Sequence, residues 1–448
     1  MSSSDRLRVL CVNPWIHDFA AYNYWAAPLG LLVIAAMLRN AGADVSFFDC
    51  LGTRPQQRER WARPHDGWGC GPYEKAPIPA PAGLANVPRR FCRYGVSPER
   101  FRSFLREAEQ PDCVLVTSSM TYWYPGVFEA IALVREAFPK VPVALGGAYA
   151  ALCTEHAEKL SGADRVFSEK SLESFFSWLE KKFGFAPETK TEELCFARWP
   201  PPATDLIERR FVPALTGLGC PYACPYCASK LLQPGFVRKE PEAAARAIAG
   251  LCRRHSLSDV AFYDDALLTD ANHHALPLLE TLGSLAPGLR FHTPNAVHAR
   301  EITPRVAHAL FRAGFTTLRL GVETDRQGQN GLLDKKLYRE EFEDAARSLL
   351  AAGFHQKNAG AYLLWGLPGQ DVEEALAAVI MVKQAGLKPV LALYTPIPHT
   401  ALWEAACKSS RYDLAADPVF TNNAVFPCRE QGFSFREIHL LRQAIQAD

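Results

Sequence analysis

The chain has 448 residues, of which 48% are apolar and 22% charged, the balance of an ordinary globular protein, so a disordered or fibrous chain is excluded. Its 49 basic and 48 acidic side chains leave a net charge of +1, so no global field favours nucleic acid or an anionic membrane. The longest strongly apolar stretch, at 28–38, is about half of the roughly 20 residues that a membrane span needs. The N-terminal residues also lack the apolar core of a signal peptide. We therefore expect a cytoplasmic protein.

The first part of the chain alternates short β-rich runs with helical patterns. Strands are predicted at 8–14, 44–49, 113–119, 141–147 and 163–167, and helices at 28–42 and about 125–138. Strands that alternate with helices predict a doubly wound parallel sheet, with its ligand crevice beyond the carboxyl ends of the strands. The sequence thus indicates an α/β domain of Rossmann type over residues 1–190.

A segment at about 52–110, rich in Pro, Gly, Arg and aromatic residues, interrupts this pattern between the second and third strands. A connection of this length inside an α/β domain is either an ordered cover over the ligand edge or a plain loop, and the composition leaves both open. After the domain, residues 191–207 have the composition of a linker.

A second α/β domain is predicted over residues 208–404, followed by a C-terminal extension at 405–448. Its candidate strands are 211–217, 259–265, 289–295, 316–322, 358–366 and 389–396, each separated from the next by a helical segment. Six βα repeats predict a partial parallel (β/α)6 barrel, with its chemistry at the carboxyl ends of the strands.

Thirteen cysteines are present, an odd number that argues for reduced thiols, some of which hold a metal. Cys220, Cys224 and Cys227 have the spacing C-x3-C-x2-C directly after the first barrel strand. Three thiolates on one loop can hold three irons of a [4Fe-4S] cube and leave the fourth iron without a protein ligand. The alternative is zinc, but structural zinc sites normally use four ligands in paired spacings, and no suitable fourth residue follows nearby.

This loop, with the aromatic Tyr226 before its last cysteine, resembles the signature of the radical S-adenosylmethionine (SAM) superfamily. The resemblance implies that the open iron binds SAM through its amino and carboxylate groups. It also implies that one-electron reduction cleaves SAM to methionine and a 5'-deoxyadenosyl radical. Tyr226 is counted among the SAM-binding residues on this basis.

The residues after the later barrel strands match the same family one by one. Asp264 and Asp265 stand where relatives contact the SAM amino group, although helix capping by Asp265 is an alternative. Asn295 is expected at the methionine carboxylate, with a simple turn as the alternative. Glu323 is expected at the ribose hydroxyls, in preference to a surface acid.

Two further strand ends complete the predicted SAM pocket. Gly366, in a segment that runs from Leu364 to Gly369, resembles the adenine-side element of the family, where glycine lets the backbone approach the base. Pro398 belongs to a run that resembles the P-x-P-G-T element of the cobalamin-linked branch. His399 stands where that element has glycine, and its role is open.

An α/β domain before such a barrel resembles the cobalamin-binding domain of this branch. The residues that the resemblance places near the corrinoid are small ones after the third and fourth strands, namely Thr117, Ser118, Ser119, Gly146 and Gly147. The D-x-H-x-x-G motif that supplies a histidine to cobalt in many cobalamin proteins is absent. His17 is either a cobalt ligand or a surface or capping residue, and a relic domain without cobalamin is the alternative to a binding domain.

The sequence therefore predicts an enzyme that uses a [4Fe-4S] cluster, SAM and cobalamin to modify an unactivated C–H bond, with methyl transfer as the outcome. One alternative is a cobalamin-independent rearrangement or cyclisation, and another is a non-catalytic iron-sulfur redox sensor. The expected partners are a small-molecule substrate of unknown identity and an electron donor such as flavodoxin or ferredoxin. Nucleic acid is not expected as a partner.

Overall fold

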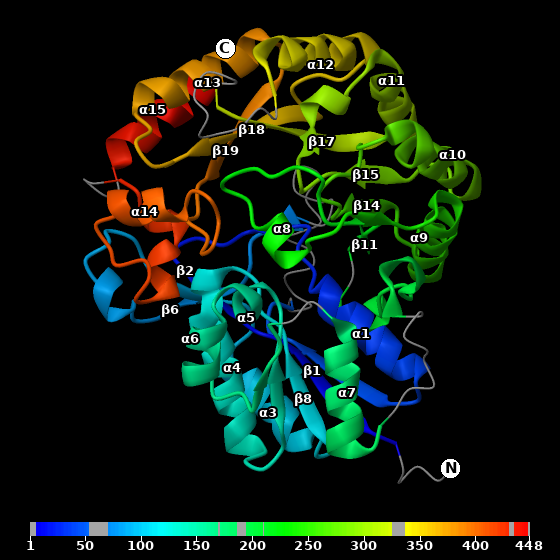
Figure 1. Ribbon diagram of the computed structural model, residues 1–448, viewed down its shortest axis with the longest axis vertical. Helices are drawn as coiled ribbons and strands as arrows, with labels where there is room; N and C mark the ends of the chain where they lie inside the picture. The colour runs from blue at the N-terminus through cyan, green and yellow to red at the C-terminus, as the bar shows by residue number, and fades with distance from the viewer. Residues whose placement is uncertain are drawn as a thin grey trace. The chain divides into compact units, whose positions relative to one another are not determined.

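The computed structural model describes residues 6–52, 70–168, 171–185, 194–208, 210–324, 337–429 and 434–446. It divides into two compact units, Met1–Arg210 with Ala416–Thr421, and Phe211–Ala415 with Asn422–Asp448 (Figure 1). The segment at 405–448, expected as a separate extension, is shared between them. No helix among the described residues is both long and apolar enough to span a bilayer.

The first unit contains a five-stranded parallel sheet in the order β10-β9-β8-β1-β4. Its strands are β1 (Arg8–Asn13), β4 (Asp44–Asp49), β8 (Cys113–Val116), β9 (Val143–Leu145) and β10 (Arg165–Val166). The helices around it are α1 (Leu29–Asn40), α3 (Pro98–Glu107), α4 (Tyr124–Ala137), α5 (Ala148–Leu152), α6 (Thr154–Leu160) and α7 (Leu172–Phe183). The predicted doubly wound fold is confirmed, with its switch point between β1 and β8.

The structure describes residues 70–110 of the insertion at 52–110, and residues 53–69 of it lie outside the described part. It supplies β5 (Cys70–Gly71), β6 (Lys75–Pro77), β7 (Cys92–Tyr94) and α3, and β7 pairs with β2 (Ile16–Asp18) just beyond the end of β1. α3 begins after Ser97 with Pro98 in its first turn and buries Phe101 and Leu105 in the core of the sheet. The helix that connects β4 to β8 therefore lies inside the insertion.

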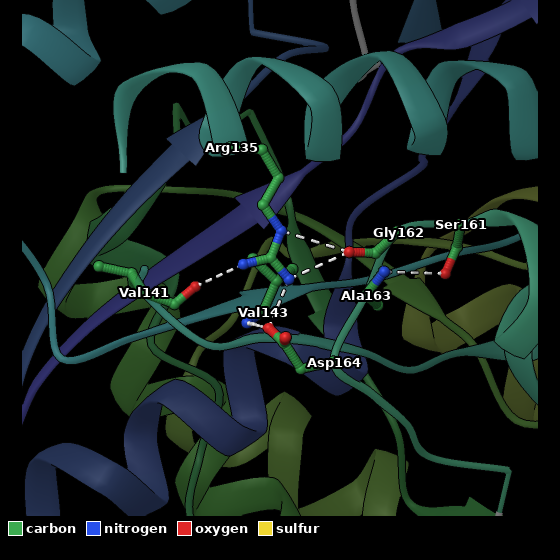
Figure 2. A network of polar contacts seen from close by, with 7 residues as sticks. All are labelled: Arg135, Val141, Val143, Ser161, Gly162, Ala163 and Asp164. Atoms are coloured by element: carbon green, nitrogen blue, oxygen red, sulfur yellow. Dashed lines mark hydrogen bonds and ion pairs between the residues drawn. The ribbon is translucent and has the colours of Figure 1, made fainter. Parts of the chain in front are cut away.

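At the amino ends of β9 and β10, one arginine of α4 ties the sheet to the turn before β10 (Figure 2). Arg135 donates to the carbonyl oxygens of Val141 at 2.8 Å and Gly162 at 3.0 Å, and pairs with Asp164. Asp164 in turn accepts from the backbone N–H of Val143 at 2.6 Å. This network holds together the amino ends of the strands, which are remote from the predicted ligand edge at their carboxyl ends.

The second unit is an open parallel sheet in the order β11-β14-β15-β17-β18-β19, with β16 also paired to β17. The strands are β11 (Val212–Ala214), β14 (Asp259–Phe262), β15 (Arg290–His292), β16 (Val297–His298), β17 (Phe315–Glu323), β18 (Ala359–Trp365) and β19 (Lys388–Leu393). Its longer helices are α9 (Pro241–His255), α10 (Ala275–Leu285), α11 (Pro304–Ala313), α12 (Arg339–Ala352) and α13 (Val372–Gln384), which form an arc outside the strands (Figure 1). The predicted partial barrel is confirmed.

The rest of the tail after 404 belongs to this barrel, apart from one short strap. α15 (Phe435–Gln446) buries Leu441 with Trp365 and Phe426. α14 (Trp403–Ser409) and the short α8 (Ser229–Leu232) complete the helices of the unit. The barrel core is therefore closed by residues that follow the last strand.

The strap at 416–421 belongs to the first unit. Tyr124 donates to Asp417 at 2.9 Å, and Thr121 and Thr421 share a hydrogen bond of 3.0 Å between fully buried hydroxyls. A side-chain carbon added to Gly83 would lie 2.4 Å from the ring of Phe420, which shows how closely that ring packs. The N-terminal unit is therefore completed by residues near the other end of the chain.

Replacing Thr421 with valine should lower the free energy of unfolding of the first unit by about 1–3 kcal/mol, because the buried hydroxyl of Thr121 loses its partner. The shape of the side chain is nearly unchanged, so the effect reports the two hydrogen bonds of the Thr421 hydroxyl, with Thr121 and with the carbonyl oxygen of Pro418. Urea denaturation followed by hydrogen exchange in β8 measures it. Thr421→Ser, which keeps the hydroxyl, is the control, and equal stability of the valine variant and the native chain would contradict the prediction.

Candidate active site

The cysteine loop is closed at its base by two short antiparallel strands, β12 (Gly217–Leu218) and β13 (Val237–Arg238). Gly219 has φ +84°, and a Cβ on it would lie 1.9 Å from the carbonyl oxygen of Gly235. Only glycine permits this approach of the two backbone segments. The paired strands β12 and β13 form the neck of the loop, and this neck explains the sequence GLG directly before the first cysteine.

Within the loop, the thiol of Cys227 has polar neighbours suited to a thiolate. Cys220 is buried, whereas Cys224 and Cys227 are partly buried. Cys227 donates its backbone N–H to Cys224 O at 3.0 Å, and its Sγ lies 3.2 Å from Ser229 Oγ and 3.4 Å from Ser229 N. Tyr226, the aromatic residue of the signature, is partly buried in the same loop.

The chemistry of the donor set, three thiols on one loop, fits a [4Fe-4S] cluster. A [4Fe-4S] cube distributes its thiolate ligands over separate irons, so three thiols spread along one loop suit it. A structural zinc site would require four ligands gathered around one point.

Asp264 secures the neck of the loop from the end of the neighbouring strand β14. Its buried carboxylate accepts from the backbone N–H of Thr216 at 3.1 Å, from the hydroxyl of Thr216 at 2.6 Å and from the N–H of Gly217. Burial raises the pKa of Asp264 to about 6, against the effect of these hydrogen bonds. The hydroxyl of Thr216 also lies 2.9 Å from Nε2 of His274. The carboxylate of Asp264 is therefore engaged within the protein.

Asp265 is placed differently from its neighbour. It is partly buried, and burial raises its pKa while a hydrogen bond with the side chain of Ser229 lowers it. Ser229 is the residue that also contacts Cys227. Of the two carboxylates expected at the SAM amino group, Asp265 is thus the one beside the cysteines.

The ends of the third and fourth strands present Asn295 and Glu323. The amide of Asn295 is exposed and donates to the carbonyl oxygen of Tyr263 at 2.8 Å, which links two adjacent strand ends. Glu323 has φ +71°, in the left-handed region, and the register between β17 and β18 shifts just before it. A non-glycine residue held in this conformation stores strain of the kind often found at functional sites.

The fifth strand ends in a tight turn at Gly366, which has φ +93°. The N–H groups of Gly366 and Leu367 donate to Oε1 of Gln370 at 2.9 and 3.2 Å. Trp365 is buried, with the guanidinium of Arg429 4.8 Å from its ring centroid, so its ring belongs to the core. The residue at the turn itself, Gly366, therefore presents only backbone atoms at the end of the strand.

The turn at Pro398 meets the cysteine loop through the backbone. Leu402, four residues on, donates its N–H to the carbonyl oxygen of Pro225 at 3.0 Å. His399 is exposed and has φ +67°, a conformation that favours glycine and that histidine adopts with some strain. The glycine expected in this element thus corresponds to a real backbone requirement that His399 meets.

The five residues predicted near cobalamin gather at the ends of β8 and β9. Ser118 donates to Gly146 O at 2.7 Å and accepts from the N–H of Ala150 at 3.2 Å. Gly147 has φ +97°, and a Cβ there would lie 2.1 Å from Ser118 O, whereas a Cβ on Gly146 would meet nothing within 4 Å. The remaining two, Thr117 and Ser119, are partly buried and exposed.

His17 is engaged within the first unit. Its Nε2 lies 2.8 Å from Glu129, whose other oxygen accepts from Arg93 at 2.9 Å. Burial raises the pKa of Glu129, but His17 and Arg93 more than offset this and lower it. His17 is buried beside Glu129, so the surface alternative is wrong, and the cobalt-ligand alternative stays a prediction.

Three residues that shape the site escaped sequence reasoning. Thr216 stands directly before the loop, so its position could have suggested a role. Ser229 follows the last cysteine by two residues, but serine there has no distinctive meaning. His298 lies 3.7 Å from Cys220 across 78 residues of chain, and no local pattern marks it.

Known proteins resemble both the barrel and the fold of the whole chain. Residues 215–382 match the family model of the radical SAM superfamily. The radical SAM methyltransferase TsrM of Kitasatospora setae, solved with cobalamin and a [4Fe-4S] cluster bound, is similar over 90% of this chain and 78% of that one, with 16% identity and a TM-score of 0.61. OxsB, a cobalamin-dependent SAM radical enzyme solved with aqua-cobalamin and SAM, is similar over 87% and 54%, with 14% identity and a TM-score of 0.58.

A relative found by sequence matches a smaller part of the chain. An uncharacterized methyltransferase of Pyrococcus horikoshii is 25% identical over 196 residues, which are 43% of this chain and 41% of that protein. The chain thus spans less than half the length of this relative. Residues 215–382 therefore match the radical SAM superfamily, and the chain has the fold of the cobalamin-dependent radical SAM enzymes TsrM and OxsB.

Proposed function

We propose that this enzyme transfers a methyl group to an unactivated carbon of a small molecule, using SAM and cobalamin. The observation that carries the proposal is the extent of the fold similarity. The similarity to TsrM covers 90% of this chain, and so includes the N-terminal α/β unit as well as the barrel. A barrel alone would support radical chemistry without indicating cobalamin.

The chain's own residues supply binding and orientation at the barrel. Cys220, Cys224 and Cys227 would hold the cluster, which when bound supplies the electron that cleaves SAM. Asp265 would accept a hydrogen bond from the SAM amine, because its carboxylate lies beside Ser229 and the cysteine loop. Glu323 would accept from the ribose hydroxyls at its strand end.

Three strand-end elements would complete the SAM pocket. Tyr226, Asn295 and Gly366 would flank the methionine and adenine parts, and Pro398 would shape the turn that reaches the loop at Pro225. Asp264 would act at one remove, by holding the neck of the loop through Thr216. These residues would keep SAM in one orientation while excluding water.

In the first unit, Thr117, Ser119 and Gly146 would contact cobalamin. Ser118 and Gly147 would support them, because both are engaged in joining β8 to β9. The open space above Gly146 is what close approach of a bulky group to the backbone requires. An electron donor of the flavodoxin or ferredoxin class would supply the reducing electron.

The native protein tests this function after anaerobic reconstitution with iron, sulfide and hydroxocobalamin, followed by desalting. We expect corrin absorbance to stay with the protein, and SAM and dithionite to yield 5'-deoxyadenosine. If a protein with an intact cluster forms no 5'-deoxyadenosine and consumes no SAM, the result would contradict radical chemistry. SAM cleavage in a protein that retains no corrin would instead favour a cobalamin-independent rearrangement or cyclisation.

A further inference from the structure

We propose that His298 sets the reduction potential of the cluster through a hydrogen bond to the sulfur of Cys220. Nε2 of His298 lies 3.7 Å from Cys220 Sγ, and both side chains are buried. This distance suits an N–H···S hydrogen bond, for which the neutral tautomer with hydrogen on Nε2 is sufficient. The inference rests on the proposed assignment of the cluster to the cysteine loop.

His298 is held by its own strand and by the cysteine loop. Its backbone belongs to β16, which pairs with β17 so that His298 is opposite Gly321. The ring of Tyr222, which lies within the cysteine loop, packs against it with centroids 4.1 Å apart. Tyr222 is itself fixed by donating to Glu301 at 2.7 Å. The loop therefore contacts His298 at two points, through a sulfur and through an aromatic ring.

A hydrogen bond to a cluster sulfur favours the reduced state, because the added electron increases negative charge on the cluster and its thiolate ligands. The effect is strengthened by the low dielectric constant of a buried site. Reduction takes one electron from an external donor, and no bond is formed or broken at His298. His298 is therefore a positioning residue that makes the cluster easier to reduce.

Potentiometric titration of the reconstituted protein with dithionite, followed by EPR and without SAM, measures this effect. His298→Phe keeps a ring against Tyr222 but removes the donor, so we expect the midpoint potential to fall. The expected size is about a tenfold change in the reduction equilibrium, or about 59 mV for one electron. His298→Gln, which places an N–H near the same point, should restore most of the loss.

His308→Phe is the matched control, because His308 is an exposed histidine on α11 and the chemical change is identical. Its potential should equal that of the native protein. An unchanged potential in His298→Phe with full iron content would overturn the inference and leave the proposed function intact. A native chain that assembles no cluster would overturn both.

A second measurement does not depend on the variant assembling its cluster. Native protein labelled with 15N only at histidine should show a hyperfine coupling from one imidazole nitrogen to the reduced cluster in pulsed EPR. Absence of that coupling in a fully loaded protein would also overturn the inference. Its presence in the native protein and loss in His298→Gln or His298→Phe would support it.

Discussion

Replacing Asp264 with alanine should reduce the cluster content of the reconstituted protein to the residual level of Cys224→Ala, although Asp264 is not a ligand. The change leaves the buried hydroxyl and N–H of Thr216 and the N–H of Gly217 without their acceptor. Each such group costs about 1–3 kcal/mol when it is left unsatisfied, and all of them lie at the neck of the cysteine loop. Iron and sulfide analysis after anaerobic reconstitution measures the result.

The neighbouring carboxylate supplies a matched comparison. Asp265→Ala should retain the cluster, because Asp265 does not hold the neck, and should raise the apparent KM for SAM by about 10- to 100-fold through loss of a charge-assisted hydrogen bond. Asp264→Asn keeps an acceptor oxygen and should recover part of the cluster. Full iron content in Asp264→Ala would refute the structural role. Equal loss of iron in both alanine variants would refute the division of roles between the two residues.

This division shows where sequence reasoning stops. The strand before Tyr263-Asp264-Asp265 was predictable from its apolar run, and so was the presence of acids at its end. Which acid turns toward Thr216 depends on backbone geometry past the strand, where consecutive side chains point in different directions. The local sequence therefore predicts the strand end and its acidic residues, while the direction in which each side chain points depends on packing.

Helix α3 and the strap at 416–421 were missed for two different reasons. α3 had a local signal, Ser97-Pro98 followed by Phe101 and Leu105 on one face, but it lay inside a segment whose composition suggested loop. The strap had none, because the pairing of Tyr124 with Asp417 joins residues 293 apart in the chain. Long-range contacts of this kind, like that of His298 with Cys220, leave no trace in local patterns.

Two of the six described non-glycine residues with positive φ illustrate an intermediate case. His399 occupies a left-handed conformation where the resembling element has glycine, so the departure noted in the sequence coincides with a backbone constraint that the structure shows. Glu323 is also left-handed, but nothing in its neighbours marks it. The resemblance marked His399 as a departure without explaining it, and the structure was needed to show the left-handed backbone at both positions.

Replacing Gly147 with alanine should destabilise the first unit by about 2–5 kcal/mol. Its φ of +97° with ψ of −172° lies in a region essentially restricted to glycine, and the added methyl would meet Ser118 O at 2.1 Å and Ser118 N at 2.7 Å. Both obstacles are backbone atoms, so no side-chain rotation relieves the clash. Urea denaturation monitored in β8 and β9 measures the loss.

Gly146→Ala, one residue earlier, separates stability from binding. A Cβ at Gly146 meets nothing within 4 Å, so stability should change by less than about 0.5 kcal/mol. If a cobalamin group approaches this backbone, the same methyl should weaken corrin retention by about 5-fold or more, since overpacking costs about 1–3 kcal/mol. A stable Gly146→Ala protein that binds hydroxocobalamin as tightly as the native chain would remove Gly146 from the binding surface. Weakened binding without loss of stability would place the corrinoid at the end of β9, because only a bound group would occupy the space that the structure leaves open there.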